Sequence, residues 1–226
     1  MTTGLLTALL ASCGLPAPPP LPTPPPTSPV PDLVPTSVPT APPPSDAELA
    51  AALLTAADIG GSYRSIPIEA NAAGGLGDGV TQCGEAASDD GATPGGRRAE
   101  AGFQGGQLGP FVAEVLTALP QTDAQRAMAA FRRAMQECAE FTSSGDLSGV
   151  TIRLEQLSFP TMGDETFAYR VIAAAGGGLV LYGHVVAVRH RDVLVLITLM
   201  QVGSPEVGPT AEIVAKAVDK LKRVRR

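Results

Sequence analysis

The 226-residue sequence predicts an α+β domain, in which helices pack against a central antiparallel β-sheet, preceded by a disordered Pro-rich linker. Two patterns predict this fold class. Apolar residues recur at helical spacing in three segments, and they alternate with polar residues in most of the segments between them. Sequential strands joined by short turns pair antiparallel, and helices with one apolar stripe bury it against a sheet. We therefore expect the order helix, two strands, helix, four strands, helix.

Residues 1–12 resemble a signal peptide. The run Leu5–Ala11 (LLTALLA) is too short to span a bilayer but fits the apolar core of a signal peptide. The sequence LASCG around Cys13 is similar to the bacterial lipobox, in which the Cys thiol receives diacylglycerol and the chain is cut just before it. Cys13 is therefore the expected lipid-attachment residue; the alternative is an incidental cysteine in a disordered tail. Because Met1–Gly4 contains no Lys or Arg, we expect the true start to lie upstream.

Residues 13–44 form the predicted Pro-rich tether. Of the 22 prolines, 15 lie between Pro16 and Pro44, and Asp32 is the only charged residue before position 45. Proline fixes φ and removes a hydrogen-bond donor, so the segment favours polyproline II rather than a packed core. At about 3.1 Å per residue it reaches up to roughly 95 Å. The alternative is a PxxP ligand for an SH3-like partner. Residues 45–226 remain for one folded domain.

Three helices are expected in residues 45–226. A capping box at Ser45–Glu48 begins the first helix, and a second box at Thr122–Gln125 begins the next. Thr210 is expected to begin the last helix. The second helix carries its apolar stripe at a spacing of three and four residues, at Met128, Phe131, Met135 and Cys138.

Six strands are expected between these helices. Val193–Val202 is almost continuously apolar and should be the most buried strand. The turn before it is expected at residues 190–192, and the Gly- and Asp-rich residues 71–98 are expected to form a long surface loop. The expected strands are 99–103, 111–119, 151–157, 167–171, 179–188 and 193–202.

Two cysteines remain after Cys13. Proteins exported from the cell meet an oxidising compartment, so Cys83 and Cys138 are expected to form one disulfide. Closing a loop of about 55 residues would stabilise the domain by roughly 4 kcal/mol in the chain-entropy model. The alternative is two free, buried thiols in a cytosolic protein.

Charge and composition exclude some partners. Residues 45–215 carry 20 acidic residues against 10 Lys and Arg, and this acidic body disfavours nucleic-acid binding. Trp is absent and aromatic residues are sparse, which argues against surfaces that stack on bases or sugars. The basic end, residues 216–226, either contacts an anionic membrane surface or complements the dipole at a helix C-terminus.

No catalytic or metal-binding pattern stands out. His184 shares an apolar strand face and is expected to be a packed, hydrogen-bonded residue, whereas His190 is expected to lie solvated in a turn. No G-x-S-x-G elbow occurs, and Gly74–Gly79 lacks the GK[ST] end of a phosphate-binding loop. Asp89 and Asp90 favour a solvated turn over a calcium site. We expect no enzyme activity, no metal and no cofactor.

Several segments taken together resemble the actinobacterial surface sensor-domain family, typified by the extracellular domain of PknH-type receptor Ser/Thr kinases. They are Leu53–Tyr63 (LLTAADIGGSY), the cysteine pair with ECAEF at the end of a helix, Phe159–Thr166 (FPTMGDET) and the hairpin Val185–Leu199 before a final helix. Taken alone, Gly163–Glu165 predicts a turn. The resemblance implies an α+β domain with a cleft that takes a ligand. Kinase-type members have two disulfides, whereas this chain can form one.

These observations predict a membrane-anchored extracytoplasmic lipoprotein on the outer face of the cell membrane. Its sensor-like domain is expected to bind a small ligand or a cell-envelope partner in a concave, largely apolar pocket on the sheet, bordered by helices. The ligand-binding residues are not identified by the sequence. One alternative is an exported hydrolase with His184 beside a carboxylate and a hydroxyl in an open cleft. Another is a structural wall-associated spacer with a smooth sheet surface.

Overall fold

The computed structural model describes residues 42–60, 62–68, 96–142 and 149–225, all of which belong to the compact unit Ala41–Arg226. Its helices are α1 (Asp46–Ala52), α2 (Ala56–Ile59), α4 (Gln121–Glu137) and α5 (Val207–Val224). Its strands are β1 (Arg64–Ile66), β2 (Arg97–Gln104), β3 (Phe111–Ala118), β4 (Glu140–Thr142), β5 (Thr151–Gln156), β6 (Glu165–Ala174), β7 (Val180–His190) and β8 (Val193–Val202).

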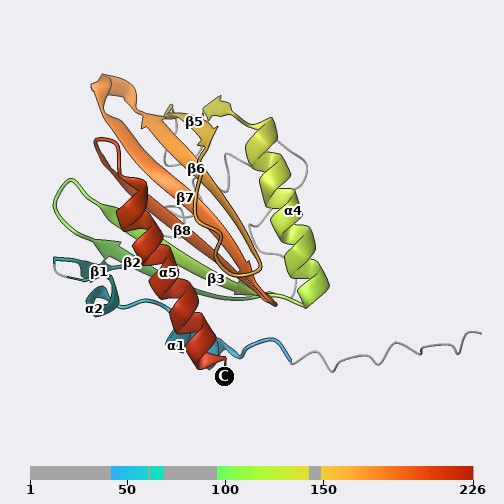
Figure 1. Cartoon of the computed structure of the whole chain (residues 1–226). Helices are drawn as coiled ribbons and strands as arrows, with labels where there is room; N and C mark the ends of the chain where they lie inside the picture. Colours follow the sequence, from blue (N-terminus) through green and yellow to red (C-terminus); the bar gives the residue numbers. More distant parts are fainter. Residues whose placement is uncertain (1–41, 61, 69–95, 143–148, 226) are drawn as a thin grey trace, which may run out of the picture. The chain divides into compact units, whose positions relative to one another are not determined.

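These strands form one eight-stranded sheet in the order β1-β2-β3-β8-β7-β6-β5-β4 (Figure 1). Every pairing is antiparallel. The expected α+β fold with a central antiparallel sheet is therefore confirmed. Strand β8 lies between β3 and β7 and joins the half of the sheet built before α4 to the half built after it.

The helices cover both faces of this sheet. Val186 of β7 belongs to the apolar cluster that includes Val214 of α5 and Leu49 of α1. Its neighbour Val185 belongs to a second cluster with Met135 of α4. Because successive strand residues point to opposite faces, α1 and α5 cover one face, here called the α5 face, and α4 covers the other, the α4 face. Figure 1 shows α5 lying along the strands of the sheet.

The helix starts agree with the sequence patterns in part. At α1 the Ser45 hydroxyl accepts the Glu48 amide at 3.3 Å, and the Ser45 amide donates to the Glu48 carboxylate at 2.7 Å, which confirms the first capping box. The box predicted at residues 122–125 is wrong, because α4 already begins at Gln121 after Pro120 and has no side-chain cap. Proline fixes a φ suited to a helix start without any cap.

Other element boundaries also differ from the predictions. Helix α5 begins at Val207, so Thr210 lies inside its first turn and is fully buried there. The short helix α2 has its own capping box, with the Thr55 hydroxyl and the Asp58 carboxylate as partners. Strand β7 keeps an unbroken buried run over residues 183–188. In β8, the strand expected to be most buried, buried and half-buried residues alternate over 193–196 and the longest buried run is 197–199.

The basic end of α5 is tied to the domain. The Arg225 guanidinium donates to both Asp192 oxygens, at 3.1 and 3.2 Å, and both side chains are almost fully buried. Lys220 forms a 2.7 Å ion pair with Asp58 of α2. The sequence patterns do not predict these pairs, which occupy Lys220 and Arg225 within the domain. Within the described ranges, no helix is both long and apolar enough to cross a bilayer.

Candidate functional site at the edge of strand β6

Strand β6 is longer than its outer neighbour. The pairing of β5 with β6 ends at Gln156 opposite Tyr169, and one further bond runs from the Leu157 amide to the Ala168 carbonyl at 2.9 Å. The chain then turns away before Pro160, which has no N–H to continue a ladder. In the part of the chain that the structure describes, residues 165–167 of β6 therefore have no strand partner on this side.

The connection from β5 to β6, residues 157–164, is fixed to the α5 face. Leu157, Phe159 and Met162 pack against the core cluster of that face. The Thr166 hydroxyl accepts the Met162 amide at 2.8 Å and donates to the Met162 carbonyl at 2.5 Å. The connection therefore arches over β6 instead of lying beside it.

A tight turn ends this connection. Asp164 accepts the Arg191 amide at 2.6 Å and the Arg189 guanidinium at 3.1 Å, so the turn is docked on the β7–β8 hairpin. Gly163 has a φ of 64°, and a Cβ there would lie 2.5 Å from the Arg189 carbonyl oxygen. This position accepts only glycine without strain. The turn predicted at Gly163–Glu165 is confirmed at Gly163 and Asp164, whereas Glu165 already begins β6. The role of this turn is to position the connection.

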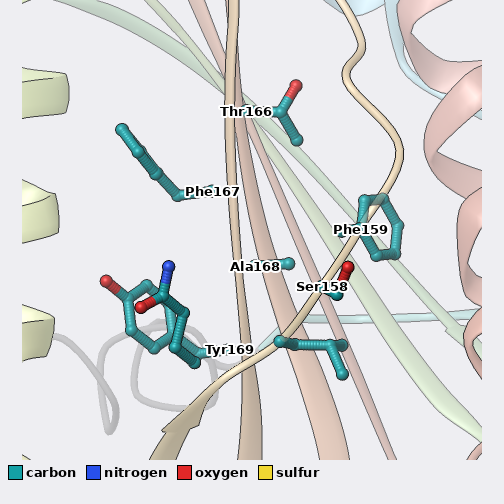
Figure 2. Close-up of a pocket in the computed structure, with 8 residues that line it drawn as sticks. Ser158, Phe159, Thr166, Phe167, Ala168 and Tyr169 are labelled. Atoms are coloured by element: carbon teal, nitrogen blue, oxygen red, sulfur yellow. The ribbon is translucent and has the colours of Figure 1, made fainter.

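Between the connection and β6 lies a notch of about 280 Å³. It is lined by Gln156–Phe159 and Thr166–Tyr169, and none of these side chains is charged. Figure 2 shows Phe159 on one side of the β6 ribbon and Phe167 and Tyr169 on the other. The guanidinium of Arg132 on α4 lies 5.0 Å from the centre of the Phe167 ring, a cation–π contact.

The notch differs from the site that the sequence analysis expects. A concave apolar pocket on a sheet face, bordered by helices, was expected, whereas the notch opens at a strand edge. Its walls combine aromatic rings with a hydroxyl, an amide and strand backbone. Sequence reasoning missed it because no local pattern shows where β5 stops pairing with β6. Pro160 within FPTMGDET is the one signal that could have located that point.

His184 is fully buried, as expected for a packed core residue. Its Nδ1 lies 2.9 Å from the Thr210 hydroxyl in the first turn of α5, and burial lowers the pKa of the imidazole. The hydrolase alternative needs His184 in an open cleft, and the structure places it under α5 instead. His190 is the last residue of β7 and is half-buried, so its expected place in a solvated turn is wrong; burial lowers its pKa as well.

Glu114 is a second buried polar residue, and sequence reasoning missed it. It lies on β3 beneath the link between α1 and α2, where its Oε2 accepts the Leu54 amide at 2.6 Å. Its Oε1 has no partner among the described residues. Burial raises the pKa of this carboxyl to about 7, although the amide of Leu54 and the charge of Lys220 act in the opposite direction.

Most of the remaining predicted site residues lie outside the part of the chain that the structure describes. Cys13, Cys83, the Gly74–Gly79 segment and the Asp89–Asp90 pair lie outside the described residues. Cys138 is buried at the C-terminal end of α4. Lipid attachment at Cys13 and the disulfide between Cys83 and Cys138 therefore stay predictions. Within the described ranges, no group of three or more His, Cys, Asp or Glu could hold a metal ion.

The fold is similar to that of a solved structure, the extracellular domain of PknH from Mycobacterium tuberculosis. The TM-score is 0.52 and the sequence identity is 17%, over 80% of this chain and 98% of that chain. No protein-family model and no curated protein matches the chain. The likeness establishes the fold alone, so the α+β fold that the sequence resemblance implies is confirmed.

Proposed function

We propose that this chain is an extracytoplasmic lipoprotein, anchored to the outer face of the cell membrane through Cys13. Its sensor-like domain binds a small ligand or a cell-envelope partner at the notch beside β6, and it acts as a binding protein rather than an enzyme. The similarity of the fold to the extracellular domain of PknH supports the sensor-like assignment. The lipobox-like LASCG and the Pro-rich tether support export and anchoring.

The notch carries the binding part of this proposal. Strand backbone at an open edge offers donors and acceptors that no neighbouring strand uses, and aromatic rings supply apolar area on two sides of it. The exposed lining of the notch is mainly polar, and convergent polar groups fix the orientation of a bound ligand. The notch volume lies near the lower end of the usual range of about 300–1,000 Å³, which favours a small ligand or one short segment of a partner.

The surroundings of His184 support binding over hydrolysis. A general base must reach a substrate proton, directly or through one water. The imidazole is fully buried beneath α5, and its described partner is the Thr210 hydroxyl. This arrangement stabilises the contact between α5 and the sheet.

The anchor is tested on protein purified from native membranes. Mass spectrometry should find an N-terminal acylated Cys13 and no trace of residues 1–12. A Cys13→Ser variant should move from the membrane fraction to the soluble extracytoplasmic fraction. An unmodified Cys13 with Leu5–Ser12 retained would contradict the anchor and leave binding at the notch untouched.

Binding is tested on the same preparation. Small molecules that co-purify should be identified by mass spectrometry and titrated against the full chain, with the NMR signals of Phe159 and Tyr169 as readout. Phe159→Ala should weaken binding at least fivefold, because it removes one aromatic wall. Leu108→Ala, an exposed change outside the notch lining, is the matched control and should leave the affinity unchanged. Equal affinities of the two variants would place the site elsewhere.

A further inference from the structure

The backbone N–H and C=O groups of β6 point to defined sides of the strand at the notch. In an antiparallel ladder, each residue of a hydrogen-bonded pair directs both its N–H and its C=O to the same neighbour, and successive residues alternate between neighbours. The Leu157 amide bonds the Ala168 carbonyl, so even-numbered residues of β6 face the β5 side. The amide of Ala175 bonds the Leu179 carbonyl in the turn to β7, which fits odd-numbered residues facing β7.

Thr166 therefore directs its backbone N–H and C=O into the open edge. If β5 continued in register, Phe159 would lie opposite Thr166, because Gln156 lies opposite Tyr169. Instead, the chain turns away at Pro160, and only the Thr166 hydroxyl contacts the connection, at Met162. Within the described part of the chain, nothing bonds the backbone groups of Thr166 or the amide of Ala168.

The lining of the notch defines what fits such an edge. Three unused backbone groups along one strand match a main chain that runs antiparallel or parallel to it, and alternate side chains of such a ligand point to the two faces. Phe159 on the α5 side and Phe167 on the α4 side would receive these side chains (Figure 2). With no charged residue in the lining, uncharged side chains suit the notch.

Resting on the proposed function of the notch, we propose that its ligand is a short, extended, uncharged peptide segment that adds to β6 as a strand. The main chain of the peptide bonds the N–H and C=O of Thr166 and the N–H of Ala168, because the Ala168 carbonyl already accepts the Leu157 amide. The predicted tether of this chain is a poor occupant, because 15 of its residues are proline and offer no N–H.

The first test uses hydrogen exchange measured by NMR on the full chain. The probe is the blocked tetrapeptide acetyl-Val-Thr-Val-Thr-amide, and its analogues N-methylated at alternate amides are the controls. Bound peptide should slow the exchange of the Thr166 and Ala168 amides at least tenfold and leave the Phe167 amide, which already faces β7, unchanged. Methylation of the amides that face β6 should abolish binding, whereas methylation of the amides between them should be tolerated.

Two variants measure what the backbone N–H of Thr166 contributes to binding. Thr166→Val keeps the N–H and loses the hydroxyl bonds to Met162, whereas Thr166→Pro loses both. Proline is tolerated at strand edges where the N–H faces outwards. The affinity of the proline variant for the tetrapeptide should be about tenfold weaker than that of the valine variant, as expected for one lost hydrogen bond.

The outcomes separate this inference from the proposed function. If a ligand shifts the signals of Phe159 and Tyr169 while the amides of Thr166 and Ala168 keep their exchange rates, strand addition is wrong and the notch remains a ligand site. If no ligand of any class perturbs these residues, the proposed function fails as well. A concentration-dependent dimer that protects the two amides without peptide would assign the edge to a second copy and overturn the inference.

Discussion

At the scale of single residues, Glu114 dominates the expected response to pH. Its carboxyl is fully buried, and burial raises its pKa to about 7, from 4.5 for an exposed Glu. Between pH 4.5 and 7 the unfolded chain ionises this group while the folded chain keeps it protonated. Stability from this group therefore falls as pH rises through that window and is constant above it. Asp58 and Lys220 are the charged groups that act on it.

Glu114→Gln should remove this dependence. The amide keeps an acceptor for the Leu54 N–H and never ionises, so the variant should be more stable than the parent at pH 8 by about 1–3 kcal/mol. At pH 5, where both side chains are neutral in the folded chain and only part of the loss has occurred, the difference should be smaller. Urea unfolding at both pH values measures the difference.

Asp58→Asn is a control in which the pH dependence of stability has the opposite sign. The hydrogen bond from Lys220 lowers the pKa of Asp58 to about 2, so its contribution is present above pH 4 and is lost as pH falls towards 2. The asparagine variant should therefore be less stable than the parent at neutral pH, and the difference in stability should shrink in acid.

A Glu114→Gln effect that is the same at pH 5 and pH 8 would show that Glu114 does not titrate between them.

At the scale of elements, the connection between β5 and β6 depends on the turn at Gly163. The turn is held by Asp164, which bonds both the backbone and a side chain of the β7–β8 hairpin. The same hairpin is held at its other side by the ion pair between Asp192 and Arg225 of α5. The turn end of one hairpin thus positions both the final helix and one wall of the notch.

Gly163→Ala should destabilise the domain by about 1–3 kcal/mol. The new Cβ would meet the Arg189 carbonyl at 2.5 Å, in addition to the cost of a positive φ. Gly149→Ala is the matched control, because that glycine also has a positive φ but no atom of the described residues lies within 4 Å of the added Cβ. Its cost should stay near 1 kcal/mol. Similar losses in thermal unfolding of both variants would mean that the contact with Arg189 is unimportant.

At the scale of the whole molecule, the fold joins two halves of the chain that are separated by α4. Strand β3 comes before this helix and pairs with β8, which comes near the end of the chain. Such long-range pairing carries a large cost in loop entropy before any contact is gained. A cross-link between Cys83 and Cys138, which lie before and after β2, β3 and α4 in the sequence, would restrict the unfolded chain over this region.

The disulfide is tested on unreduced protein taken from outside the cell. Under denaturing conditions, neither Cys83 nor Cys138 should react with a thiol reagent. Reduction, or the double change Cys83→Ser with Cys138→Ser, should lower the free energy of unfolding by about 4 kcal/mol. Two reactive sulfhydryls in the unreduced, denatured chain would contradict the bridge.

Local patterns located the elements well but placed several starts wrongly. The first capping box succeeded because both of its partners lie within four residues, at Ser45 and Glu48. The second failed because α4 begins at Gln121, directly after Pro120, without a side-chain cap. Thr210 resembled a helix start, yet its hydroxyl meets His184 of β7. The choice between these roles depends on a residue 26 positions away.

The sequence by itself determined the fold class, six of the eight described strands and the expected burial of His184, because periods of 2 and 3.6 residues are properties of neighbours along the chain. Tertiary structure alone decided that Glu114 lies under the α1–α2 link and that β6 extends beyond the end of β5. Burial and free edges arise from the register between distant strands, and that register is fixed only when all eight strands have paired.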